Sequence, residues 1–196
     1  MRALTVALLA LLAPASCGTT RDAPLRYLDQ DGVARDPFAL ADRRGVALLF
    51  VRTDCPISNR YAPALSQIHA TFAPLGIDFW AVHPDGGTDA AAARAHLAEY
   101  GLPFGALLDP AHRLVDRAGA TVMPQAALFD RAGRLLYSGR IDDRFIDFGI
   151  ARAEPTRHEL LDALESLLEG KEPPCAHAPA IGCLIADLAS PPEAHR

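Results

Sequence analysis

The pattern of apolar residues predicts two central strands in the first half of the chain. Val46–Val51 is apolar at every position. Such a run indicates a strand buried on both faces, because a half-exposed strand would alternate apolar and polar side chains. Ile77–His83 is predicted as the second central strand. Shorter strands are predicted over residues 26–29, 106–108, 125–129 and 135–140, the last two joined by a turn at 130–133.

Four further segments have helical patterns. They cover residues 58–72, 88–100, 112–118 and 155–169. In the first of them the apolar residues lie on one side, and Pro74 with Gly76 ends the helix. Strands that alternate with helices, followed by an antiparallel pair and a closing helix, predict an α/β sandwich with a mixed central sheet.

The first residues have the composition of an export signal. Met1 and Arg2 precede the apolar run Ala3–Ala13, which is too short to span a bilayer, and small residues then offer a cleavage site. Cys17 follows at once and is a candidate for lipidation, although Pro14 stands where lipoprotein signals usually have leucine. We therefore expect an exported protein, either in the periplasm or anchored to the membrane as a lipoprotein.

Length and charge fit one domain behind this leader. The chain has 196 residues, of which 50% are hydrophobic, enough for one well-buried core. Its formal net charge of -5 argues against a nucleic-acid partner. We predict a signal peptide or lipoprotein signal over 1–17, one domain over 24–170 and an extended Pro- and Ala-rich tail over 171–196. The tail carries Cys175 and Cys183.

Cys55 has the context of a reactive thiol. It falls between the first central strand and the first predicted helix, and Pro56 suits the first helical position because it lacks an N–H there. Unpaired backbone N–H groups and the helix dipole favour a thiolate at this place and lower the pKa of the cysteine. The alternative is a small buried residue that only fills space. We expect a sulfur that is both ionised and reachable.

Several motifs resemble the thioredoxin-like superfamily. The segment Thr53–Ser58 after a strand, Val122–Pro124 before a strand and the hairpin with its closing helix carry this resemblance. Asp29–Gly32 and the long first helix look like the redoxin branch, which includes the AhpC/TSA and TlpA-like proteins. Cys55–Pro63 and Gly139–Arg144 are similar to exported bacterial redoxin-domain proteins. The resemblance covers about residues 24–187 and implies a three-layer sandwich of helices around a mixed sheet.

The resemblance also implies site residues. Cys55 would be the nucleophile, and Met123-Pro124 a cis peptide bond opposite it that positions a substrate backbone. Thr53, Pro56, Met123 and Arg140 would contact substrate. Alternatively, Pro124 is an ordinary trans proline that begins a strand, and Asp142–Arg144 form a solvated turn with weak ion pairs.

Two departures from the family patterns bear on the activity. Thioredoxins carry Cys-x-x-Cys, but the second cysteine position here is Ser58, so a resolving thiol must come from elsewhere. Peroxiredoxins carry Pro-x-x-x-Thr-x-x-Cys, whereas this chain has Leu48 and Arg52 at the Pro and Thr positions. The second departure weakens a peroxidase interpretation, although Arg52 could still favour the thiolate.

The partner of Cys183 is open at this stage. The tail could fold back and bring Cys183 to Cys55 as the resolving thiol. Alternatively, Cys183 and Cys175 could close a small loop between themselves. A copper site is a third use of these residues, because thiolate, thioether and imidazole groups are available at Cys55, His83, Met123, Cys175, His177 and Cys183.

These observations predict a thiol–disulfide oxidoreductase of the cell envelope. Cys55 and Cys183 would be catalytic together with Pro124, the partners would be protein thiols and disulfides, and no cofactor or metal is expected. One alternative is a thiol peroxidase that acts on peroxide. The other is a copper-binding or assembly module. The sequence does not indicate the oligomeric state.

Overall fold

The computed structural model describes residues 26–186. The predicted leader over 1–17, with its candidate lipidation site Cys17, lies outside the described residues. The strands are β1 (Tyr27–Leu28), β2 (Ala34–Arg35), β3 (Gly45–Phe50), β4 (Ile77–His83), β5 (Gly105–Leu108), β6 (Val122–Met123), β7 (Gln125–Asp130), β8 (Leu135–Gly139), β9 (Phe145–Asp147), β10 (Ile150–Ala151), β11 (His177–Ala178) and β12 (Cys183–Leu184). The helices are α1 (Pro56–Arg60), α2 (Ala62–Phe72), α3 (Ala90–Tyr100), α4 (Arg113–Ala118) and α5 (Glu159–Glu169), with a 3-10 turn at Ala73–Leu75.

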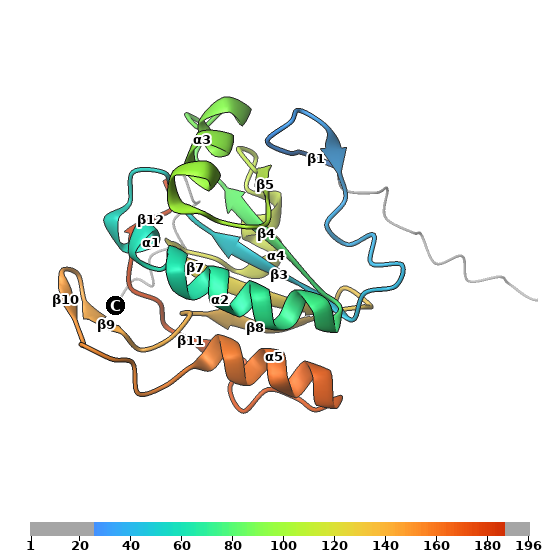
Figure 1. The fold of residues 1–196 in the computed structure, drawn as a ribbon, viewed down its shortest axis with the longest axis vertical. Helices are drawn as coiled ribbons and strands as arrows, with labels where there is room; N and C mark the ends of the chain where they lie inside the picture. The colour runs from blue at the N-terminus through green and yellow to red at the C-terminus, as the bar shows by residue number, and fades with distance from the viewer. Residues whose placement is uncertain (1–25, 187–196) are drawn as a thin grey trace, which may run out of the picture.

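A six-stranded mixed sheet in the order β11-β8-β7-β3-β4-β5 forms the centre of the domain (Figure 1). β3 is parallel to β4 and antiparallel to β7, so the strand that ends near Cys55 has a neighbour on each side. All six residues of β3 are buried, as expected for a strand covered on both faces. The predicted α/β fold with a mixed sheet flanked by helices is confirmed.

Helices and loops cover the two faces of this sheet. Apolar residues of α2, α3 and α5 pack in one cluster that also contains Cys55. On the opposite face, α4 packs with Tyr27, Leu40 and the apolar side of β3. Figure 1 shows α2 and α5 lying side by side over the sheet. The chain therefore forms three layers, and the start of α1 lies where β3 ends.

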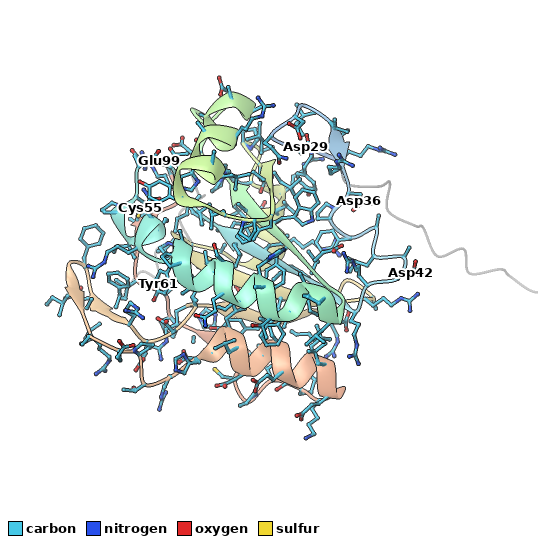
Figure 2. The ribbon with its side chains drawn as sticks, in the orientation of Figure 1. Asp29, Asp36, Asp42, Cys55, Tyr61 and Glu99 are labelled. Atoms are coloured by element: carbon cyan, nitrogen blue, oxygen red, sulfur yellow. The ribbon has the colours of Figure 1, made fainter. Side chains whose placement is uncertain are left out.

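The first predicted helix is broken, and the continuous helix predicted over 58–72 is wrong in this respect. α1 ends at Arg60, and α2 begins one residue after Tyr61. Pro63 explains the break, because it has no N–H to continue the ladder of hydrogen bonds through this point. Figure 2 shows Cys55 and Tyr61 at the two ends of the short helix α1.

The last helix also begins later than predicted, at Glu159 rather than near Pro155. The side chain of Asp143 accepts hydrogen bonds from the backbone N–H groups of Thr156 and Arg157. These groups are thereby held by another part of the chain before the helix begins. The apolar face of the helix otherwise packs as expected, with Leu160 and Leu164 buried.

The described part of the tail, residues 171–186, pairs with the domain at two places. β11 pairs in parallel with β8 at the edge of the main sheet. β12 pairs antiparallel with β6, in a separate two-stranded sheet. Between residues 26 and 186, no helix is long and apolar enough to cross a membrane.

Candidate active site

Cys55 stands at the N-cap of α1, directly after the loop that follows β3. Its backbone is extended (φ -85°, ψ 112°), and its carbonyl accepts the first helical hydrogen bond from Asn59 at 3.0 Å. Pro56 occupies the first helical position, as predicted. The Cys55 sulfur therefore lies beside the unpaired N–H groups at the start of the helix.

The expectation of a reachable sulfur is wrong for this arrangement of the chain, because Cys55 is only 1% exposed. Two groups lie against the sulfur. The Met123 carbonyl oxygen is 3.5 Å away, and the Cys183 sulfur is 2.7 Å away. Both cysteines are free thiols. The cover over Cys55 thus comes from the loop before β7 and from the tail, not from the core alone.

The peptide bond between Met123 and Pro124 is cis, as the resemblance implied. Met123 is also the last residue of β6, so its backbone takes part in the short sheet with the tail. The side chain of Met123 is buried in the cluster on the α4 face. Met123 therefore belongs both to the wall opposite Cys55 and to the strand that pairs with the tail.

Strand β12 lies on the β6 edge in a defined register. Cys183 is opposite Met123, and Leu184 is opposite Val122. The Ile185 N–H continues the pairing by donating to the Thr121 carbonyl at 3.0 Å. This register places the Cys183 sulfur against Cys55.

Cys175 lies elsewhere in the tail. It is exposed, and its thiol donates to the His177 carbonyl at 2.8 Å. Of the two arrangements that the sequence left open, the structure therefore shows Cys183 beside Cys55 and not beside Cys175.

The pKa values of the two adjacent thiols are shifted in opposite directions. Burial raises the pKa of Cys55, but hydrogen bonds from the Cys183 thiol and from Ser58 and Ile57 outweigh it, so the pKa is below its ordinary value. Burial and the adjacent Cys55 raise the pKa of Cys183 to about 11, despite the nearby Arg52 guanidinium. Cys55 therefore ionises at a lower pH than Cys183, and once Cys55 is ionised the Cys183 thiol is the hydrogen-bond donor of the pair.

Ser58 contributes more than its place in the sequence suggested. It stands where thioredoxins have their second cysteine, and both its backbone N–H and its hydroxyl stabilise the Cys55 thiolate. Ser58 is one of the buried residues of α1. In the sequence this serine stands out only as a missing cysteine. A polar residue three positions after a helix-start thiol was the signal that could have identified it.

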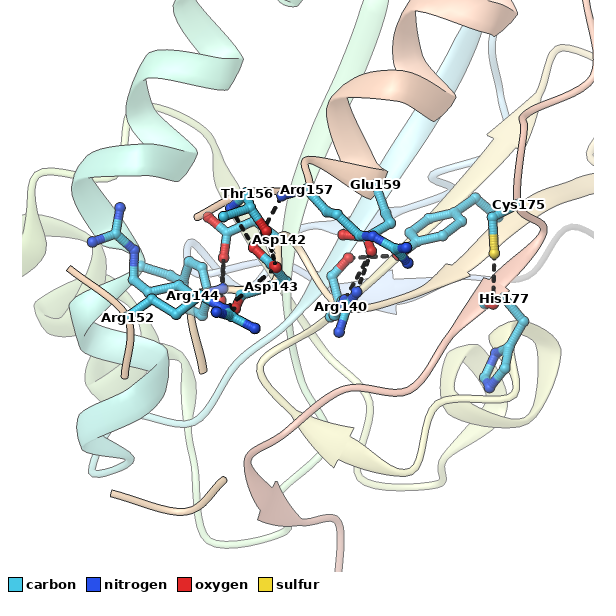
Figure 3. A network of polar contacts seen from close by, with 12 residues as sticks. Arg140, Asp142, Asp143, Arg144, Arg152, Thr156, Arg157, Glu159, Cys175 and His177 are labelled. Atoms are coloured by element: carbon cyan, nitrogen blue, oxygen red, sulfur yellow. Dashed lines mark hydrogen bonds and ion pairs between the residues drawn. The ribbon is translucent and has the colours of Figure 1, made fainter. Parts of the chain in front are cut away.

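The other predicted substrate contacts are distributed unevenly. Thr53 is part of the loop beside Cys55, and its carbonyl accepts from the Asn59 side chain at 3.0 Å. Arg140 points into a different network, where it pairs with Glu159 (Figure 3). Among the hydrogen bonds and ion pairs of residues 26–186, none joins Arg140 to either sulfur. The structure therefore gathers Thr53, Pro56 and Met123 around Cys55 but leaves Arg140 outside.

The prediction of a solvated turn over Asp142–Arg144 is wrong. Asp142 and Asp143 are 6% and 5% exposed. Asp142 accepts a hydrogen bond from the Tyr61 hydroxyl at 2.6 Å. Asp143 accepts hydrogen bonds from Thr156 and Arg157 (Figure 3). The bond from the Thr156 hydroxyl, together with those from the backbone N–H groups of both residues, holds the pKa of Asp143 well below its usual range. These carboxylates tie the segment before α5 to the junction of α1 and α2.

The candidate copper donors are spread over the domain. His83 is buried beside His96, with 5.4 Å between the ring centres, while His177 belongs to β11 at the far edge of the sheet. In the part of the chain that the structure describes, no three His, Cys, Asp or Glu side chains gather closely enough to hold a metal ion.

The fold and the cis proline opposite a helix-start cysteine define a thioredoxin-like redoxin domain. The family model of the AhpC/TSA family matches residues 21–138, and the chain belongs to this family. The matched range contains Cys55 and Pro124 and ends before Cys183. Membership supports redox chemistry in general terms. No curated protein matches the chain in sequence.

Solved structures share the fold. An uncharacterized conserved protein from Geobacillus kaustophilus has a TM-score of 0.71 at 23% identity, over 83% of this chain and 88% of its own. A hypothetical protein from Sinorhizobium meliloti has a TM-score of 0.69 at 24% identity, over 83% and 90%. A secreted disulfide oxidoreductase from Mycobacterium tuberculosis has a TM-score of 0.50 at 20% identity, over 75% and 96%.

Proposed function

We propose that the protein is a thiol–disulfide oxidoreductase in which Cys55 is the nucleophile and Cys183 the resolving thiol. One observation carries this proposal: the sulfurs of Cys55 and Cys183 lie 2.7 Å apart at the start of α1. The pKa of Cys55 is lowered and that of Cys183 is raised, so Cys55 is the first of the two to ionise. A buried cysteine that only fills space has no need of such a partner from 128 residues away along the chain.

The proposed exchange has two steps. The Cys55 thiolate attacks a substrate disulfide, so that a Cys55–substrate disulfide forms and one substrate thiolate leaves. Cys183 then loses its proton and attacks the Cys55 sulfur, which releases the second substrate thiolate and leaves a Cys55–Cys183 disulfide. Two electrons pass to the substrate, and an external dithiol must reduce the protein before the next cycle.

The pKa shifts of the two thiols support an order in which Cys55 reacts first and Cys183 second. The charge of Cys55 is one of the causes that raise the pKa of Cys183. Once Cys55 is bonded to substrate it has no charge, and the pKa of Cys183 falls. The nearby Arg52 guanidinium also favours the Cys183 thiolate at that stage. Cys183 therefore becomes the nucleophile only after the first step.

The remaining assignments follow from the position of Cys55. Met123 and Pro124 would align the substrate backbone, and Thr53 and Pro56 would contact it. Arg140 could contact only a larger substrate that extends toward Glu159. The leader predicted over residues 1–17 supports action in the cell envelope on exported proteins.

The deciding experiment is Cys55→Ser, measured as reduction of a protein disulfide by the reduced protein. We expect the rate to fall by about 100-fold or more, because a serine hydroxyl is not ionised near neutral pH. Cys175→Ser is the matched control, since it removes a thiol that lies away from the pair. An unchanged rate for Cys55→Ser would refute the proposal.

A thiol peroxidase is the second candidate, and the cover over Cys55 favours it. A small oxidant can approach a sulfur that a folded protein does not reach. The Cys55 thiolate would take one oxygen from a peroxide, which leaves as an alcohol or water. The resulting sulfenic acid would condense with the Cys183 thiol and release water. Rapid consumption of hydrogen peroxide by the reduced protein, lost in Cys55→Ser, would establish this activity.

A further inference from the structure

Strand β12 occupies the place that a partner of Cys55 has to enter. Cys183 contacts the Cys55 sulfur, and the backbone on both sides of Cys183 is paired with Thr121–Met123. Cys55 is almost fully buried with the tail in this position. An external disulfide can therefore meet Cys55 only after β12 has left the β6 edge.

We propose that residues 182–185 are a built-in stand-in for substrate, and that tail and substrate compete for the β6 edge. The partner would be an extended chain segment with glycine directly before its reacting cysteine and an apolar residue two positions after it. This inference rests on the proposed thiol–disulfide exchange and adds the class of segment that the site accepts.

Gly182 gives the first requirement. A Cβ atom at this position would lie 2.1 Å from the Met123 carbonyl oxygen and 3.0 Å from the Pro124 nitrogen. Both are backbone atoms of the wall opposite Cys55, so they cannot turn aside as a flexible side chain would. A segment that places its cysteine where Cys183 lies therefore needs glycine before it.

Ile185 gives the second requirement. Its side chain is buried in the apolar cluster on the α4 face, and it lines a cavity of about 340 Å³ together with Arg52, His112 and Met123. The residue between, Leu184, is 75% exposed. The site thus restricts the residue types at the positions of Gly182 and Ile185. It places no such restriction on the position of Leu184.

Synthetic peptides test the preference directly. The probe is Ala-Ile-Gly-Cys-Leu-Ile-Ala with its cysteine in a disulfide with a chromophoric thiol. Replacing Gly with Val, or the second Ile with Asp, should slow release of the chromophore by the reduced protein by about tenfold or more. Replacing Leu with Ser should change the rate by less than about twofold. Each peptide is also reduced with a small dithiol, which corrects for its intrinsic reactivity. Equal corrected rates for the Gly and Val peptides would overturn the proposal.

The competition is tested in the full chain. Gly182→Ala should weaken the docking of β12 and speed the first attack on the Gly peptide by about tenfold. Gly87→Ala is the matched control, because a Cβ there would meet only the Asp85 carboxylate, at an ordinary contact distance of 3.6 Å. Ile185→Ser should act in the same direction as Gly182→Ala and covers the case that Gly182→Ala folds poorly. Rates unchanged in both tail variants would refute the competition.

The two proposals can fail separately. If Cys55→Ser reacts with the Gly peptide as fast as the unaltered protein, the proposed function fails. If the reaction requires Cys55 but does not distinguish Gly from Val, only the stand-in role of the tail fails.

Discussion

The tail contains two strands of equal length, β11 and β12, which pair with different parts of the domain. β11 extends the main sheet beside β8, and the Ser138 and Arg140 N–H groups donate to the carbonyls of Ala176 and Ala178. β12 lies on the isolated strand β6, outside the main sheet, and brings a sulfur to Cys55. Among the hydrogen bonds of residues 26–186, none joins β11 to Cys55, Met123 or Cys183, whereas β12 contains Cys183 itself.

Each strand is seated against a glycine, but the glycine belongs to opposite partners. At β11 it is Gly139 of the domain that admits the tail, since a Cβ there would lie 2.4 Å from the Ala178 carbonyl oxygen. At β12 it is Gly182 of the tail that fits against the domain. At β11 the domain supplies the glycine that makes room for the tail, whereas at β12 the tail supplies the glycine that fits against β6. This difference is expected if β11 stays attached to the domain and β12 can be replaced by a substrate segment.

The largest expected effect separates the two tail cysteines. Cys183→Ser should reduce steady-state turnover by about 100-fold and trap a disulfide between Cys55 and substrate, because Cys175 lies away from Cys55 and cannot release the substrate in place of Cys183. Cys175→Ser should leave turnover unchanged, because its thiol faces the His177 carbonyl. Non-reducing electrophoresis with mass spectrometry detects the trapped species. Equal turnover in both variants would show that β12 has no part in the chemistry.

The second prediction concerns the anchor. Gly139→Ala should lower the free energy of unfolding by about 1–3 kcal/mol, because its Cβ would press against the Ala178 backbone and the Tyr137 hydroxyl. Gly182→Ala should lower it less, because β12 pairs with a two-residue strand outside the main sheet. Urea denaturation, with Gly87→Ala as control, measures both. A larger loss in Gly182→Ala would reverse the roles given to the two strands.

The third prediction is a pH dependence. The pKa of Cys55 is below its ordinary value, partly through the hydrogen bond from Cys183. The thiolate absorbance of Cys55 should therefore rise with pH at a midpoint below that of a free thiol. Cys183→Ala should move this midpoint upward, since it removes the donor. Cys183→Ser keeps a hydroxyl donor and should move it less.

Both midpoints are followed by ultraviolet absorbance in a Cys175→Ser background, so that one fewer thiol contributes. Identical midpoints in the alanine and serine variants would show that the contact between the two sulfurs does not stabilise the thiolate.

The smallest effect is expected at the junction of α1 and α2. Tyr61→Phe removes the hydrogen bond to Asp142 and should lower the free energy of unfolding by about 1 kcal/mol. Exchange activity should change little, because Asp142 also accepts from the Arg144 N–H and stays paired. Tyr100→Phe, at a half-buried position on α3, is the control. A large loss of activity with unchanged stability would instead assign Tyr61 a direct part in the site.

Much of the site could be predicted from local signals. The apolar run of β3, the helix that begins at Pro56 and the cysteine between them place Cys55 at a helix start whatever the rest of the chain does. The hairpin of β7 and β8 follows from its turn, in which Asp130 accepts from two backbone N–H groups. The break between α1 and α2 at Tyr61 could also have been predicted, because Pro63 interrupts the helical hydrogen bonds there.

The burial of Asp142 and Asp143 could not be predicted from the sequence. Two adjacent acidic residues in a turn are usually solvated, and only their partners at Tyr61 and Thr156 make burial tolerable. Those partners come from α1–α2 and from the segment before α5, which meet the turn only in the folded chain. A polar residue's surroundings depend on such distant segments, so its own sequence neighbours carry little information about them.

The sequence by itself determined the order of strands and helices and the place of Cys55 at the start of a helix, because hydrophobic periodicity, proline and turn residues act over a few positions. Only the tertiary structure decided which thiol meets Cys55 and how far that sulfur is covered. The two sulfurs are separated by 128 positions. Their contact depends on where β11 and β12 attach to the folded domain, and no spacing along the chain specifies that.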